Sequence, residues 1–214
     1  MQIWYNQIGM MARHEKFLLD AGFVPEHVET QKSVIYILES EFRIVYCNAY
    51  WDEFARANGG ERVQRDEVRG TCVLDVTPEE LKSFYRDAYR QVQRGHADWE
   101  HDFECSSAED YRLFHMRAVG LGAGHVLVEN SLRVEKEHGE DRIGVSASSD
   151  RYVSKDGVVT MCMHCRRTKR VAEFPEKLSE IGDIVWDWVP AFVEDSPAVV
   201  SHGLCRMCYP LFFQ

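Results

Sequence analysis

The chain has 214 residues, of which 45% are hydrophobic, and a formal net charge of −10 at pH 7. This is enough apolar material to fill one large core or two smaller ones, which excludes a disordered chain. The acidic balance disfavours nucleic acid as a partner, because phosphate binding needs a basic surface.

The seven cysteines are unevenly distributed. Cys47, Cys72 and Cys105 stand alone, whereas the other four form two C-x-x-C pairs. This pattern is typical of metal binding in a reducing compartment rather than of a secreted disulfide framework. No apolar run is long enough to cross a bilayer, and the N-terminus lacks the pattern of a secretory leader. We therefore expect a cytoplasmic protein without membrane contacts.

The first 32 residues predict a helical cap that ends near Gly22. Its apolar stripe must be buried, either on a neighbouring sheet or against a second copy of the chain. The stripe consists of Trp4, Ile8, Met11 and Leu18.

Two strands and two helices are expected next. Residues 34–38 and 43–46 are short β-branched runs that predict a hairpin. Asn48 is placed to cap a helix that ends at residues 58–60, because two glycines stop it there. Residues 77–94 show helical spacing of apolar side chains and predict a longer helix.

Three more strands follow in the sequence. Residues 98–105 alternate strictly, so the acidic side chains, including that of Glu104, are expected on the solvent face. Residues 111–119 alternate as well, and a glycine-rich turn leads into a last strand at 125–129. The expected order is therefore two strands, helices and three strands, which indicates an α+β fold.

The chain from residue 133 to 156 is polar and serine-rich, and it predicts a connecting helix followed by a linker. Four parts are therefore expected: a helical cap (1–32), a sheet domain (33–132), a connector (133–156) and a metal-binding module (157–214).

The C-x-x-C pairs carry the strongest chemical signal. Each pair places two thiolates on one side of a tight turn, so two turns brought together complete a tetrahedron around zinc. Four thiolates saturate the ion and leave no position for a substrate, which favours a structural over a catalytic site. The predicted zinc ligands are Cys162, Cys165, Cys205 and Cys208.

Other interpretations of this region remain open. The pairs also fit a redox switch, or a metal site in which His164 or His202 replaces a cysteine. We expect His164 to face solvent and His202 to support its loop by a hydrogen bond. The long connection between the pairs must fold by itself, and its apolar residues 174–175 and 185–189 supply the material.

A basic cluster surrounds the cysteine pairs. We expect it to balance the thiolate charge; contact with phosphates, as in a nucleic-acid-binding zinc-ribbon regulator, is the alternative. Its members are Arg166, Arg167, Lys169, Arg170 and Arg206.

Three segments of the C-terminal part form a recognisable motif: Cys162-Met163-His164-Cys165-Arg166-Arg167, Trp188-Val189-Pro190 and Ser201-His202-Gly203-Leu204-Cys205-Arg206-Met207-Cys208. Together they resemble a zinc-binding tail found on bacterial PAS-domain and receiver-domain signalling proteins. This chain has Arg206 where that tail usually has proline, a change that removes no ligand.

Residues 33–132 resemble a PAS domain in the order of their elements and in the runs 43–49 (RIVYCNA) and 68–75 (VRGTCVLD). The resemblance implies a five-stranded antiparallel sheet with helices across one face, enclosing a pocket for a ligand or cofactor.

Nine side chains are expected to face that pocket, either as plain core or as a ligand site. They are Trp51, Phe54, Phe84, Tyr85, Trp99, His101, Phe103, Phe114 and Met116.

Haem and flavin are both disfavoured as occupants of the pocket. Haem would use His101, but haem-binding PAS sensors commonly use a histidine on the long helix, and residues 77–94 contain none. Flavin photochemistry would use Cys72, whose neighbours differ from those in light-sensing relatives, so we expect Cys72 to be a small buried residue. A different small ligand is still compatible with the pocket.

The sequence thus predicts a non-enzymatic signalling or regulatory protein. The chain after Leu132 is too short for a kinase or cyclase, and no nucleotide-binding loop or nucleophile motif is present. The PAS-like domain is expected to sense a small ligand or to mediate homodimerisation, and the zinc module to contact a protein partner. A nucleic-acid-binding regulator, a haem or redox sensor, and an enzyme with an open zinc or a reactive thiol are the rivals.

Overall fold

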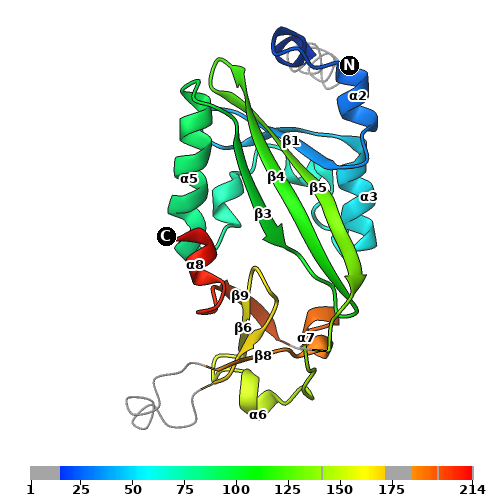
Figure 1. The fold of residues 1–214 in the computed structure, drawn as a ribbon, viewed down its shortest axis with the longest axis vertical. Helices are drawn as coiled ribbons and strands as arrows, with labels where there is room; N and C mark the ends of the chain where they lie inside the picture. The colour runs from blue at the N-terminus through cyan, green and yellow to red at the C-terminus, as the bar shows by residue number, and fades with distance from the viewer. Residues whose placement is uncertain (1–14, 141, 172–184, 197, 214) are drawn as a thin grey trace. The chain divides into compact units, whose positions relative to one another are not determined.

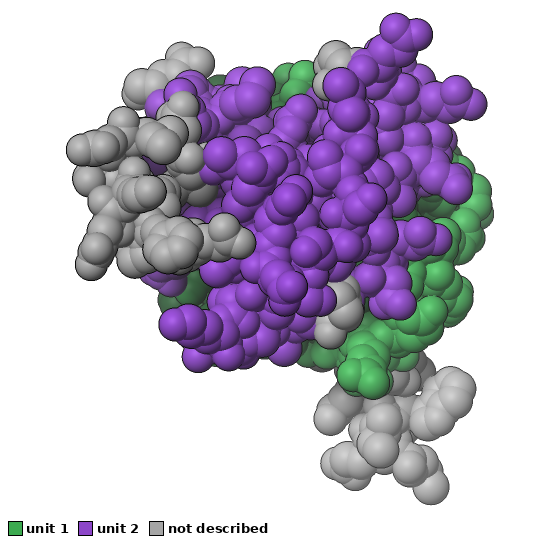
Figure 2. Space-filling model, turned by 90° about the horizontal axis from the view of Figure 1, so that it is seen from below, with its two compact units in different colours: residues 1–77, 82–102, 115–131 green, residues 78–81, 103–114, 132–214 purple. Residues whose placement is uncertain are grey.

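The structure is a computed structural model that describes residues 15–140, 142–171, 185–196 and 198–213 (Figure 1). Its contacts define two compact units (Figure 2). The first comprises residues 1–77, 82–102 and 115–131, and the second comprises residues 78–81, 103–114 and 132–214. Within the described residues, no helix is long and apolar enough to span a bilayer.

A five-stranded antiparallel sheet has the order β2-β1-β5-β4-β3. This is the architecture that the PAS resemblance implies, and the predicted fold class is confirmed. The strands are β1 (Val34–Leu38), β2 (Ile44–Cys47), β3 (Trp99–Glu104), β4 (Asp110–Gly122) and β5 (His125–Glu137).

Strand β1 is an interior strand of the sheet, next to the edge strand β2, and all of its residues are buried. It pairs with β2 as the predicted hairpin, and with β5 on its other side. Ile35 and Ile37 pack against Leu18 and other apolar side chains of the N-terminal segment. The continuous β-branched run of β1 is therefore explained by cover on both sides. Trp4, Ile8 and Met11 of the predicted stripe lie outside the described residues.

The helices of the first unit are anchored to the sheet. Asn48 caps α3, as predicted: its Oδ1 accepts from the Trp51 amide at 3.3 Å and from the Ile35 amide of β1 at 3.1 Å. The side chain of Asn48 thus caps the first turn of α3 and also binds the backbone of β1. The helices and the one 3-10 turn are α2 (Pro25–Thr30), α3 (Ala49–Ala57), α4 (Arg65–Val68), η1 (Val73–Asp75) and α5 (Glu79–Gln93).

The predicted connecting helix at the start of residues 133–156 is wrong. Residues 133–137 instead continue β5, and within the described part of the connector only α6 (Ser149–Tyr152) is helical. Polar side chains are tolerated in this extension because they pair across strands. Arg112 of β4 donates to Glu135 of β5 at 2.7 Å, and Lys136 lies over the ring of Tyr111. The predicted domain boundaries themselves stay a prediction.

The second unit contains a small four-stranded sheet of order β8-β7-β6-β9, in which β9 runs parallel to β6. Its strands are β6 (Val158–Cys162), β7 (Thr168–Lys169), β8 (Trp186–Asp187) and β9 (Val199–Gly203). Two short helices complete it: α7 (Pro190–Glu194) and α8 (Tyr209–Phe212).

The core of the second unit is apolar and includes part of the connection between the cysteine pairs. Trp188 and Val189 of that connection are buried, as expected, while residues 174–175 lie outside the described part. The buried cluster consists of Tyr152, Val159, Met161, Val189 and Phe192.

Candidate metal centre

The four cysteines named from the sequence lie together. Their sulfur atoms are all within 4.8 Å of one another, and each side chain is buried. The Sγ atoms of Cys165 and Cys205 are 3.6 Å apart. Four sulfurs at about 2.3 Å from a zinc ion are about 3.8 Å apart, whereas a disulfide needs about 2.05 Å. The arrangement therefore fits a tetrahedral metal site and not a pair of disulfides.

Parallel pairing of β6 with β9 brings the two cysteine turns together. Cys162 lies opposite Gly203 in the register, so each turn leaves the same end of its strand. The Met163 amide donates to the Gly203 carbonyl at 3.0 Å, and the Cys205 amide donates to Cys162 Sγ at 3.4 Å. Strand pairing in the sheet thus brings together two cysteine pairs that a long connection separates in the sequence.

Each turn is also closed within itself. The Arg166 amide donates to the Cys162 carbonyl at 2.9 Å, and the Cys208 amide donates to the Cys205 carbonyl at 3.0 Å. Arg206, which stands where the related tail has proline, lies exposed in the second turn. This substitution leaves the turn's hydrogen bond intact.

The buried thiols compete for protons. Hydrogen bonds from Cys162, Cys205 and Cys208 lower the pKa of Cys165, and a hydrogen bond from Cys162 helps to lower the pKa of Cys205 to about 7. The same mutual contacts raise the pKa values of Cys162 and Cys208. Four thiolates at this spacing need a cation among them, because like charges in a buried site disfavour ionisation. Zinc is the ion that such a donor set suits best.

The basic cluster beside the cysteines has several roles rather than one. Arg167 bonds a cluster thiol: although burial opposes it, its hydrogen bond to Cys165 raises its pKa. Arg170 pairs instead with both carboxylate oxygens of Asp187, and Arg166 donates to the sulfur of Cys105 at 3.3 Å. The expectation that the whole cluster balances the thiolate charge stays a prediction, with Arg167 as the member whose bond to a thiol is described.

His164 is buried, with 9% of its surface exposed. The prediction that it faces solvent is therefore wrong. The amide of Glu104 donates to its Nε2 at 3.3 Å, so this nitrogen carries no proton. The proton of the neutral ring is then on Nδ1, which lies 3.5 Å from Cys208 Sγ. Burial lowers the pKa of His164, which favours this neutral form. His164 thus links a candidate metal ligand to the end of β3.

The end of β3 carries a buried ion pair that the alternation pattern misplaced. Glu104 was expected on the solvent face, but its side chain is 7% exposed and accepts from Arg142 Nη1 at 2.7 Å. Ser106 donates to the same carboxylate oxygen at 2.5 Å. Arg142 also lies over the ring of Trp188 at 4.6 Å. Tertiary contacts with residues distant in sequence explain the burial, and no local pattern marks it.

Two further residues named from the sequence are His202 and Cys72, of which Cys72 differs from expectation. His202 lies on an exposed part of β9 and outside the thiol cluster. Cys72 is half-buried rather than buried, and its thiol donates to the carbonyl of Glu41 at 3.7 Å.

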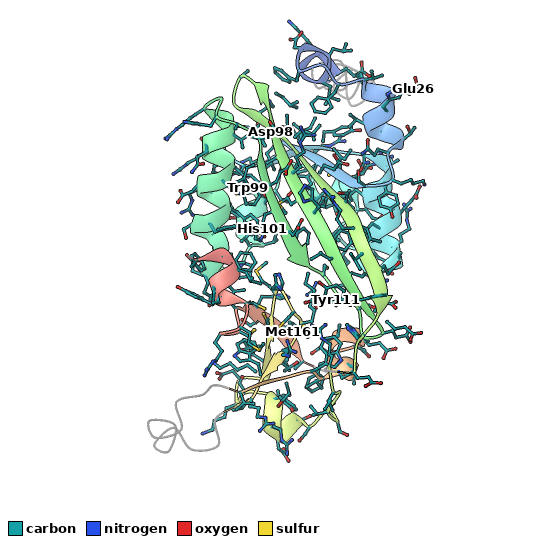
Figure 3. The ribbon with its side chains drawn as sticks, viewed as in Figure 1. Glu26, Asp98, Trp99, His101, Tyr111 and Met161 are labelled. Carbon is teal, nitrogen blue, oxygen red and sulfur yellow. The ribbon has the colours of Figure 1, made fainter. Side chains whose placement is uncertain are left out.

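The nine predicted pocket residues are distributed over both compact units. In the first unit, Trp99 and His101 of β3 stack at 5.7 Å, and both contact the ring of Phe84 (Figure 3). In the second unit, Phe103 and Phe114 stack on each other at 5.6 Å. Tyr85 extends the first group, Trp51 meets Tyr36 edge-on, Met116 is buried, and Phe54 is half-buried.

Two buried tyrosines, Tyr36 of β1 and Tyr89 of α5, were not predicted from the sequence. The hydroxyls of Tyr36 and Tyr89 lie 3.3 Å apart, and the Tyr89 hydroxyl donates to Met116 Sδ at 3.8 Å. Burial raises the pKa of Tyr36 to about 12 and also raises the pKa of Tyr89 well above its usual value. Their phenols therefore stay neutral. Tyr36 lies within the apolar run of β1 and was therefore treated as an apolar residue. Its hydroxyl was the signal that a polar group would be buried there.

Several solved structures are similar to half of this chain. The phage VqmA–DPO complex matches with 14% identity and a TM-score of 0.37 over 50% of each chain, so this chain spans about half the length of that match. The PAS domain of the Cronobacter turicensis quorum-sensing receptor RpfR, in complex with BDSF, matches with 19% identity and a TM-score of 0.39, over 50% of this chain and 99% of that one.

The photoactive yellow protein domain of the sensor histidine kinase Ppr from Rhodospirillum centenum matches with 13% identity and a TM-score of 0.37, over 51% of this chain and 94% of that one. No protein-family model and no curated protein matches the sequence. These similarities are too low to assign a family, and the PAS-like fold rests on the strand order described above.

Proposed function

We propose that the chain is a non-enzymatic, cytoplasmic signalling or regulatory protein. Its PAS-like domain responds to a small ligand or to pairing with a second copy, and its zinc module presents the surface that a protein partner contacts. All seven cysteines lie in the described residues and none is in a disulfide, which fits a reducing compartment.

The bridge through His164 is the observation that carries this proposal. The ring contacts Cys208 through Nδ1 and the Glu104 amide through Nε2, and all three residues belong to the second compact unit. A displacement at the end of β3 would therefore reach a cysteine turn through two hydrogen bonds. Such a contact gives a physical route from sheet to module without an enzymatic output domain.

The four cysteines would hold the zinc ion, which contributes folding free energy to the module and has no open position for a substrate. His164 orients the turn of Cys208, and Arg167 offsets part of the thiolate charge. These roles are structural, which supports a signalling protein over an enzyme.

A nucleic-acid-binding role is less well supported. Arg167 bonds a cluster thiol, and Arg170 is paired with Asp187. Cations already engaged in this way contribute little to counterion release on phosphate binding. The net charge of −10 opposes such binding as well.

Amide hydrogen exchange tests the route through His164. Removal of zinc by a chelator should increase exchange at residues 103–106 as well as in the cysteine turns, because the ring loses its fixed partner. In His164→Ala, zinc removal should still affect the cysteine turns, but residues 103–106 should respond much less. Equal responses of residues 103–106 in the two proteins would contradict the proposed coupling. Light scattering tests pairing separately. We expect the mass of a dimer, and the mass of a monomer would contradict pairing with a second copy.

A further inference from the structure

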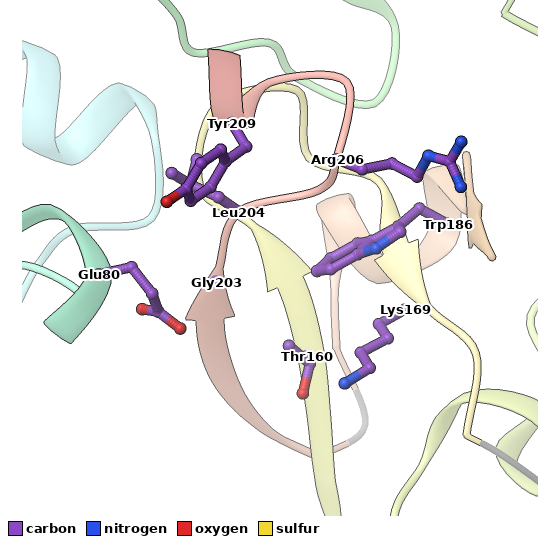
Figure 4. Close-up of a pocket in the computed structure, with 8 residues that line it drawn as sticks. All are labelled: Glu80, Thr160, Lys169, Trp186, Gly203, Leu204, Arg206 and Tyr209. Carbon is purple, nitrogen blue, oxygen red and sulfur yellow. The ribbon is translucent and has the colours of Figure 1, made fainter. Parts of the chain in front are cut away.

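The second unit contains a pocket of about 520 Å³ that no cysteine lines (Figure 4). This volume lies within the range of small-molecule sites, about 300–1,000 Å³. All of its lining residues belong to the second unit. Those that matter for recognition are Glu80, Thr160, Lys169, Trp186, Gly203 and Leu204.

The hollow exists because Gly203 has no side chain. A Cβ atom built there would lie 3.7 Å from the Thr160 methyl carbon, 3.8 Å from Trp186 Cη2 and 3.9 Å from Glu80 Oε1. A methyl group, an indole edge and a carboxylate oxygen thus surround one point above the strand. A ligand atom at this point would contact all three.

Lys169 supplies the opposite charge. It pairs with Trp186 in the register of β7 and β8, and residues paired in this way point to the same face of a sheet. Figure 4 shows the ammonium group of Lys169 and the carboxylate of Glu80 approaching the pocket from opposite sides, with the indole beside Lys169. Among the ion pairs of the described residues, none joins Glu80 to Lys169, so both charges are available to a ligand.

We propose that this pocket binds a small zwitterion of the α-amino-acid class. The ligand's ammonium group pairs with Glu80, its carboxylate pairs with Lys169, and its apolar or aromatic side chain lies against Trp186 and Leu204. A ligand with one charge would use only one of these two groups, whereas a zwitterion forms a charge-assisted hydrogen bond with each of them. This site would exist whether or not the PAS-like domain senses a ligand.

Titration calorimetry on the zinc-loaded full chain tests the charge requirement. L-phenylalanine should bind, whereas L-phenylalaninamide, which lacks the carboxylate, and N-acetyl-L-phenylalanine, which lacks the ammonium group, should each bind at least about tenfold more weakly. Glu80→Gln should weaken L-phenylalanine about tenfold and abolish its preference over the N-acetyl compound. Lys169→Gln should abolish its preference over the amide. Lys155→Gln, an exposed lysine of the same unit, is the matched control and should change nothing.

A filled pocket provides the second test. Gly203→Val should abolish binding of L-phenylalanine while zinc content and circular dichroism are unchanged. If that variant does not fold, Trp186→Ala should weaken binding about tenfold in its place. Equal affinity for the three compounds, or no heat of binding at millimolar L-phenylalanine, would overturn the proposal. Because zinc content is measured independently, neither result would bear on the metal centre.

Discussion

The imidazole of His164 has a single proton arrangement that satisfies both of its contacts. Its Nε2 accepts from a backbone amide, so its Nδ1 is the donor facing Cys208. A hydrogen bond to a ligating sulfur orients the ligand and holds its charge. The contact therefore belongs to the chemistry of the metal site even though His164 is not among its ligands.

We predict that His164→Ala lowers zinc affinity by about tenfold to a hundredfold. The loss follows from the missing hydrogen bond at Cys208 and from the cavity beside the turn. Competition with a chromophoric chelator measures it. His202→Ala is the matched control, since this exposed histidine lies three residues before Cys205 and outside the cluster. Similar losses in the two variants would contradict a specific role for His164.

The ion pair of Arg142 with Glu104 is buried, and removal of one partner leaves a charge without compensation. We predict that Arg142→Met destabilises the protein by about 3 kcal/mol, measured by urea denaturation. The exposed pair of Lys32 with Glu53 is the control, and Lys32→Met should cost less than about 1 kcal/mol. A cost below 1 kcal/mol for Arg142→Met would show that water reaches the carboxylate.

Single residues differ in how well the sequence predicts their surroundings. The grouping of the four cysteines was predictable because a C-x-x-C turn fixes its geometry locally. Glu104 was not, because its burial depends on Arg142, which lies 38 positions away. The burial of His164 was not predictable either, because its position inside a turn does not indicate that the end of β3 contacts it.

The buried phenol of Tyr36 on β1 should make the stability of the folded protein fall at alkaline pH. Burial raises the pKa of Tyr36 from 10.0 to about 12, so the folded state holds its proton more tightly than the unfolded state does. This stability is fully present below about pH 10 and is lost as the pH rises toward 12. The shift of Tyr36 alone corresponds to about 2–3 kcal/mol.

Urea denaturation at a series of pH values checks this prediction. Stability should fall between pH 10 and 12, and Tyr36→Phe should make the fall shallower. Tyr209→Phe, at a side chain that is half exposed, should leave the slope unchanged. An unchanged slope in Tyr36→Phe would mean that other groups cause the alkaline loss.

Elements were predictable where local periodicity decides them. The run of β1 and the cap at Asn48 each have a local physical cause, and both were found from the sequence. The length of β5 was not, because cross-strand pairs such as Arg112 with Glu135 extend it through a polar segment. The parallel pairing of β6 with β9 was also missed, since it joins segments with no shared local pattern.

For the whole molecule, the order of elements was a better guide than any single motif. Two strands, helices and three strands led to the observed five-stranded sheet, although no short run of the sequence specifies it. The division into compact units was not foreseen. Residues 103–114 fall in the same compact unit as the four cysteines, and in this unit the Glu104 amide donates to His164 and Arg166 donates to the sulfur of Cys105.

Folding of the cysteine module should depend on its metal. The module has a small apolar core, and a structural zinc ion contributes folding free energy that such a core does not supply alone. Removal of the ion should therefore unfold residues 158–213, whereas strands β1 and β2 should keep their hydrogen bonds.

Metal analysis combined with amide hydrogen exchange before and after chelation tests this most directly. We predict one zinc ion per chain, four thiols protected from alkylation, and loss of protection in β6 and β9 once the ion is removed, with β1 and β2 unchanged. A protein without zinc, or a module that keeps its protection after the ion is removed, would contradict the account.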